Sequence, residues 1–122
     1  MDKKLYKVLL KCGVQPHLLG FEYIGEAVKM VIEDREALTM VTKVLYPGIA
    51  RKFNTTPSRV ERAIRHACEQ AFNIMTLDMI YEVFGNTLDP YRGKATNSHF
   101  IAAVAGLYRQ ECSVVARRVR RS

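Results

Sequence analysis

The segment from residue 49 to residue 65 restricts the fold more than any other part of the chain. It contains two short helical patterns joined by a tight turn, and Asn54 stands where that turn needs a residue that tolerates a positive φ. Ala50 is small enough to let a second helix cross close by. Residues 55–58 combine hydroxyl caps with a proline, which is a common start of a helix. The segment therefore predicts a helix-turn-helix over about residues 44–72, whose second helix enters the major groove of DNA.

The second helix of this segment separates an apolar stripe from a basic face. At about 100° per residue, Val60, Ile64, Ala67 and Ala71 fall on one side, and the charged side chains lie opposite or beside them. A helix pair that only packs would also carry a charged outer face, so the pattern leaves that alternative open. The candidate DNA-binding residues are Thr55, Thr56, Ser58, Arg59, Glu61, Arg62, Arg65, His66 and Lys94.

Arg59 and Glu61 are the candidates for reading bases. A guanidinium early in the helix matches guanine O6 and N7, and a carboxylate can accept a hydrogen bond from cytosine N4. Alternatively, Glu61 could close a capping box with Ser58. We favour base reading, because Pro57 at the first helical position would make Thr56 the cap. The expected phosphate contacts are Arg62, Arg65, His66, Lys94 and the turn at Thr55 and Thr56.

Length and composition fit one compact domain. The chain has 122 residues, 48% hydrophobic and 25% charged, so it should be globular rather than disordered. Nineteen Lys and Arg against twelve Asp and Glu give a net charge of +7. This excess favours a polyanionic partner, although RNA-binding, ribosomal and membrane-surface proteins share it. No apolar run approaches the roughly 20 residues that span a bilayer, so we expect a cytoplasmic protein without a membrane partner.

Helical patterns cover most of the chain, and strand patterns are nearly absent. The expected helices are 21–34, 36–42, 44–53, from 57 or 58 to 72, 77–84, and one that starts at the cap cluster 96–98. Residues 85–95 form the one clear loop. The arginine-rich tail 117–121 is either an arm that reaches DNA or a frayed end. These patterns predict an all-α fold.

The sequence offers no arrangement typical of an enzyme or a metal site. Cys12, Cys68 and Cys112 are far apart and lack Cys-x-x-Cys spacing, so we expect neither a disulfide framework nor a zinc site. We expect Cys68 to be a small residue of the hydrophobic core. The sequence contains no recognisable nucleophile–base arrangement and no glycine-rich phosphate loop. We therefore expect a protein without catalytic activity or cofactor.

Residues 45–67 closely resemble the C-terminal effector domain of the stage-zero master regulator of sporulation in endospore-forming bacteria. Residues 27–31 and 96–102 extend the likeness, so that it covers about residues 14–110. The resemblance implies an all-α domain of about six helices. It also implies a transcription factor that binds short promoter boxes, often in tandem.

The resemblance further implies DNA contacts by the residues Ser58, Arg59, Glu61 and Arg62, and two copies bound head-to-tail on tandem sites. RNA polymerase or its sigma factor is the protein partner that we expect. Family members normally carry a phosphoacceptor receiver domain before the effector domain, and residues 1–122 are too few for both, so we expect a single effector domain without a receiver.

Three positions differ from the family pattern. Pro57, Cys68 and His99 stand where the resemblance would place Ala, an aliphatic residue and Glu. Two alternatives from other classes stay open. One is a helix-turn-helix interaction module, such as a polymerase or sigma-factor adaptor, without sequence-specific DNA binding. The other is the DNA-docking part of an enzyme such as a recombinase, for which this sequence offers no catalytic residues.

Overall fold

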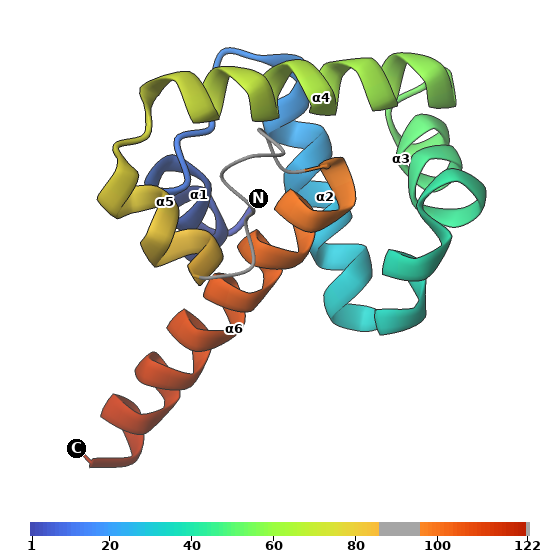
Figure 1. Ribbon diagram of the computed structural model, residues 1–122. Helices are drawn as coiled ribbons and strands as arrows, with labels where there is room; N and C mark the ends of the chain where they lie inside the picture. Colours follow the sequence, from blue (N-terminus) through green and yellow to red (C-terminus); the bar gives the residue numbers. More distant parts are fainter. Residues whose placement is uncertain (86–95, 122) are drawn as a thin grey trace.

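The computed structural model describes residues 1–85 and 96–121, with side chains through residue 114. Helices dominate these ranges, and no strand occurs in them, which confirms the all-α prediction. In Figure 1, α4 runs across one side of the molecule and the other helices lie below it. The elements are α1 (Lys3–Lys11), α2 (Leu19–Glu33), the 3₁₀ helix η1 (Arg35–Met40), the π-helical turn η2 (Val41–Leu45), α3 (Tyr46–Lys52), α4 (Pro57–Ile74), α5 (Leu77–Phe84) and α6 (Asn97–Arg121).

Helices α3 and α4 form the helix-turn-helix. Asn54, just after α3, has a φ of 54°, as the sequence predicted. The N–H of Thr55 donates to the carbonyl of Ala50 at 2.9 Å, and the N–H of Phe53 donates to the carbonyl of Ile49 at 3.0 Å. The bond that spans five residues, together with the left-handed Asn54, is the hydrogen-bonding pattern of a Schellman ending. This ending fixes the direction in which the chain enters α4.

Helix α4 crosses α2 at a glycine. A Cβ atom placed on Gly20 would lie 2.3 Å from the carbonyl oxygen of Ala63 and 2.5 Å from the Cβ of Ala67. Only a residue without a side chain lets the two helices approach this closely. On the same side of α4, Val60 and Ile64 are 0% exposed, so the apolar stripe forms part of the core. Burial of this stripe turns the opposite face of α4 toward solvent.

Helix α1 was not among the helices expected from the sequence. Leu5, Leu9 and Cys12 follow a helical spacing, and all three are 0% exposed in the core. The carboxylate of Asp2 caps the helix, accepting the N–H of Leu5 at 2.8 Å, and it also accepts the hydroxyl of Tyr108 in α6. These hydrogen bonds, that of Tyr108 above all, lower the pKa of Asp2. The interrupted apolar run at the start of the chain is therefore an amphipathic helix that packs on α6.

The region before α3 differs from the expected pair of α-helices. Residues 35–40 wind as a 3₁₀ helix and residues 41–45 as a π-helical turn, and α3 begins at Tyr46 rather than Val44. Pro47 explains this start. In a helix beginning at Val44, position 47 would have to donate a backbone hydrogen bond, which proline cannot do. In a helix beginning at Tyr46, Pro47 lies in the first turn, where no such donor is needed.

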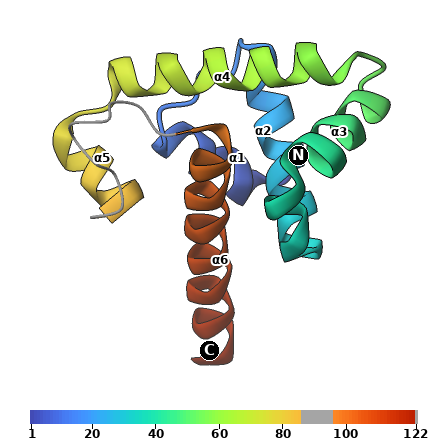
Figure 2. The same ribbon diagram turned by 45° about the vertical axis from the view of Figure 1, so that its right-hand side comes forward.

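Helix α6 includes the basic tail. It continues to Arg121, so the basic tail is helical rather than frayed. Figures 1 and 2 both show the C-terminal end of α6 pointing away from α4. The tail therefore does not lie beside the predicted DNA-binding face, and the alternative of an arm that reaches the same stretch of DNA gains no support.

Candidate DNA-binding surface

The outward face of the first turns of α4 carries the core of the predicted site. Ser58, Arg59, Arg62, Arg65 and His66 are all exposed. Because the opposite stripe is buried against α2 and α3, these five side chains share the solvent side of one helix. A protruding helix with exposed basic residues at its start has the shape and charge that fit the major groove.

Thr56 is the N-cap of α4. Its Oγ1 accepts the N–H of Arg59 at 3.3 Å and lies 3.4 Å from the Oγ of Ser58. Thr55, half-buried, lies in the turn that leads to this cap. The start of α4 is therefore capped at the place where backbone N–H groups and the positive end of the helix dipole attract a phosphate.

The cap at Thr56 excludes the capping box considered for Glu61. Ser58 is the second residue of α4 rather than its cap, so Glu61 does not stand three residues after the cap. The Oε1 of Glu61 instead lies 3.5 Å from Nη1 of Arg65, one turn further along the helix. Glu61 is half-buried, on the flank of α4 that faces α6.

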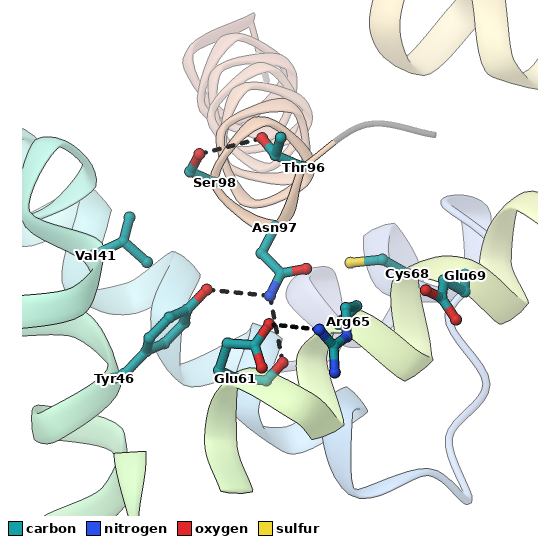
Figure 3. A pocket seen from close by; sticks show the side chains of 9 residues that line it. All are labelled: Val41, Tyr46, Glu61, Arg65, Cys68, Glu69, Thr96, Asn97 and Ser98. Atoms are coloured by element: carbon teal, nitrogen blue, oxygen red, sulfur yellow. Dashed lines mark hydrogen bonds and ion pairs between the residues drawn. The ribbon is translucent and has the colours of Figure 1, made fainter. Parts of the chain in front are cut away.

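A hollow of about 420 Å³ lies between this flank of α4, the start of α3 and the start of α6 (Figure 3). The amide of Asn97 reaches across it, donating to the hydroxyl oxygen of Tyr46 at 3.1 Å and to the carbonyl oxygen of Glu61 at 3.3 Å. Burial raises the pKa of Tyr46, against the opposing effect of the Asn97 hydrogen bond. The residues that line the hollow are Val41, Tyr46, Glu61, Arg65, Cys68, Glu69, Thr96, Asn97 and Ser98.

Sequence reasoning missed the role of Asn97. Residues 96–98 were predicted only as a cap cluster, and Thr96 does cap α6 by accepting the N–H of His99 at 3.3 Å. The signal for a further contact was the asparagine inside that cluster, since an amide has two donors beyond what a cap requires. Its partners, 51 and 36 residues away along the chain, could not be inferred without the fold.

A second hollow of about 440 Å³ lies at the elbow of the helix-turn-helix. Arg51 lines it together with Asn54 and Thr55, and the Arg51 side chain was not among the predicted residues. Its neighbour Lys52 pairs with Glu26 of α2 at 2.6 Å, so the charge of Lys52 is held against the body of the molecule. The two adjacent basic residues just before the turn were the sequence signal for a contact here. Only the structure shows that Arg51 faces the hollow while Lys52 is paired with Glu26.

The predictions for Lys94, for Cys68, for metal binding and for membrane spans remain to be compared with the structure. Lys94 lies outside the described residues. Cys68 is 3% exposed, which confirms a core residue, and burial raises the pKa of its thiol to about 12. Within the described ranges, acidic, cysteine and histidine side chains do not form a group suited to a metal ion. None of the helices described is long and apolar enough to cross a membrane.

Comparison with protein families agrees with this geometry. The family model described as "Sporulation initiation factor Spo0A C terminal" matches residues 5–120. The match extends from α1, through the helix-turn-helix, into the last turns of α6, and so exceeds the range expected from the resemblance. This is a family of DNA-binding regulatory domains and not of enzymes. The chain therefore belongs to the family of C-terminal domains of the sporulation initiation factor Spo0A, which bind DNA and regulate transcription in sporulation.

Proposed function

We propose that the chain is a sequence-specific regulator of transcription that reads the major groove with the first turns of α4. The exposed face formed by Ser58, Arg59, Arg62, Arg65 and His66 is the observation that carries this proposal. Its helix is held by a buried stripe on one side and by the Thr56 cap at its start. Such a rigid, basic, protruding helix can present side chains to base edges in a fixed register.

Within this surface, different side chains take different tasks. Arg59 reads a guanine and Glu61 accepts a hydrogen bond from a cytosine. Arg62, Arg65 and His66 contact phosphates on the flanks of the groove, and Lys94 adds a further phosphate contact. Arg51 is exposed and lines the hollow at the elbow together with Thr55, which supports a further phosphate contact by Arg51.

We further propose that two copies bind head-to-tail on tandem boxes, and that RNA polymerase or its sigma factor is the protein partner on the chromosome. A specific observation favours a protein contact at the opposite end of α4 from the DNA-binding surface (Figure 1). Ile74, Leu77 and Tyr81 are 53%, 74% and 62% exposed at the junction of α4 and α5. Large exposed apolar side chains that follow one another along the chain, as these three do over residues 74–81, favour a protein interface.

The same observation keeps one competing function open, namely an adaptor for polymerase or sigma factor without sequence-specific DNA binding. The two functions differ in what the exposed face of α4 does. In the adaptor, the arginines of α4 attract DNA without preference. In the regulator, they select a sequence.

Selection of bound DNA from a pool of random duplexes at about 0.15 M salt separates these functions. We expect enrichment of a short box, with tandem copies among the bound sequences. Arg59→Ala should weaken the enrichment, and Arg35→Ala, which removes an exposed cation from η1 instead, should leave it intact. A pool that stays random after several rounds would reject the regulator and favour the adaptor.

A further inference from the structure

The start of α6 is bonded to both helices of the helix-turn-helix through Asn97. This residue is the first of α6, Tyr46 is the first of α3, and Glu61 lies in the second turn of α4. The two amide hydrogens of Asn97 account for the two bonds, one to the Tyr46 hydroxyl oxygen and one to the Glu61 carbonyl oxygen (Figure 3). Asn97 therefore connects three helices with one planar group.

The bond to Glu61 does not compete with the hydrogen bonds of α4. A carbonyl oxygen has two lone pairs, so it can accept from its own helix and from Asn97. Tyr46 is 8% exposed and Asn97 is half-buried, and hydrogen bonds shielded from water in this way are stronger than exposed ones. The contact can therefore hold the backbone of α4 in place.

The position of this contact on α4 gives it a consequence for DNA reading. The Gly20 crossing fixes the inner side of α4, at Ala63 and Ala67, and Asn97 fixes its flank at Glu61. Contacts on two sides of a helix define its rotation about its own axis. All side chains on the outer face are attached to the same helix. A small rotation of α4 therefore moves every one of them relative to the base edges.

Glu61 is the residue at which Asn97 holds α4. Its carbonyl is held by Asn97, while its carboxylate is paired with Arg65. Asn97 thus acts on the backbone of a residue whose side chain lies at the edge of the proposed DNA-binding surface. Sites of this kind require side chains to be held within about 0.5 Å and 10–20° of the productive geometry.

We propose that Asn97 is a positioning residue for DNA recognition, which sets the rotation of α4 and with it the sequence selectivity of Glu61 and its neighbours. The inference rests on the proposed function above. Asn97 itself touches no base in this account, and it acts through the Glu61 backbone. A merely structural Asn97 would change stability and the affinity for all sequences alike.

The test compares affinity for the selected box with affinity for a scrambled duplex, for the wild type and the variants Asn97→Ala, Tyr46→Phe and Ser98→Ala. Ser98 lines the same hollow, and its hydroxyl is 3.3 Å from that of Thr96, not from α3 or α4, so Ser98→Ala is the matched control. Asn97→Ala should lower the ratio of the two affinities about 3- to 10-fold, the effect of losing a hydrogen bond. Ser98→Ala should keep the ratio, and Tyr46→Phe, which leaves Asn97 its bond to Glu61, should lower it less.

A double-mutant cycle with Glu61→Ala makes the test specific. If part of the effect of Asn97 passes through the Glu61 side chain, then Asn97→Ala should cause less loss of selectivity when Glu61 is already alanine. An unchanged ratio in Asn97→Ala, or equal losses in both backgrounds, would overturn the inference while leaving the proposed function in place. A wild type that does not distinguish the box from the scrambled duplex would overturn both. Should Asn97→Ala fail to fold, Asn97→Asp decides, because it keeps the size of the side chain but removes both amide donors, and a ratio equal to that of the wild type would overturn the inference.

Discussion

At the scale of single residues, Arg59 and Glu61 differ in how firmly the structure holds them. Arg59 gives its backbone N–H to the Thr56 cap, which leaves the guanidinium on an exposed side chain directed to solvent. Glu61 is half-buried, and its carboxylate is paired with Arg65. We therefore expect substitutions at the two positions to affect DNA selection without affecting the fold.

Arg59→Ala should abolish the preference at one G·C position of the box. A bidentate contact of a guanidinium with guanine O6 and N7 contributes about 1–3 kcal/mol of discrimination. Arg59→Lys should restore only part of it, because an ammonium group lacks the planar pair of donors. Binding assays on boxes with single base-pair changes measure this effect. An even loss over all boxes would make Arg59 a phosphate contact.

Glu61→Ala should relax selectivity at one C·G position and keep or raise non-specific affinity, because a carboxylate repels phosphates. Thermal unfolding should change little, since Glu61 does not cap α4 and an ion pair one helical turn apart contributes only about 0.3–0.5 kcal/mol. Thr56→Ala is the matched control and should lower stability by about 0.5–2 kcal/mol through loss of the cap. A Glu61→Ala protein as unstable as Thr56→Ala, with its preference intact, would contradict base reading.

At the scale of the elements, the position of α4 depends in part on contacts that the hydrophobic periodicity of the sequence does not reveal. The Schellman turn at Asn54 and the cap at Thr56 were predictable, because they rest on neighbours in the sequence. The crossing at Gly20 and the Asn97 contacts join distant segments, so they become visible only in the fold.

The fold differs from the sequence prediction at two places where the cause is local, namely helix α1 and the start of α3. Helix α1 follows a regular apolar spacing, but its four lysines obscured the amphipathic pattern. The predicted start of α3 at Val44 is two residues too early, because a proline at the fourth helical position lacks the N–H that the helix needs there. The bounds of α5, in contrast, agree with the prediction, since Thr76 caps its start and Gly85 ends it with a φ of 58°.

Gly20→Ala should destabilise the domain by about 1–3 kcal/mol, because the new methyl group would meet the backbone carbonyl of Ala63, which cannot move without moving α4. Gly106→Ala in α6 is the matched control. A Cβ at Gly106 would have nothing within 4 Å, so the same substitution should stabilise the helix by about 0.5–1 kcal/mol. Denaturant unfolding measures both. Equal stability of the two variants would show that α2 and α4 do not cross as closely as described.

At the scale of the whole molecule, charge should decide how strongly the protein holds DNA of any sequence. The net charge of +7 and the basic face of α4 predict binding that weakens steeply with salt. This general attraction and the reading of bases are separate contributions, and salt acts mainly on the first.

If about four to six phosphates are neutralised, the logarithm of the binding constant should fall with the logarithm of salt concentration with a slope of roughly −4 to −5. Arg62→Ala should reduce the magnitude of the slope by about 1, and Arg35→Ala, which changes net charge equally, should not. Titrations of a short duplex at several salt concentrations give these slopes. A slope near zero, or equal affinity for single-stranded RNA, would contradict the proposed DNA surface.

The central claim, that α4 reads the major groove, is tested most directly by replacing single guanines of the selected box with 7-deazaguanine. This base keeps its pairing but lacks the N7 acceptor in the major groove. We predict that one substitution per box weakens wild-type binding about 3- to 10-fold, the effect of one lost hydrogen bond, and that Arg59→Ala does not respond to that substitution. Wild-type binding that is unchanged by the substitution at every guanine of the box would contradict the account.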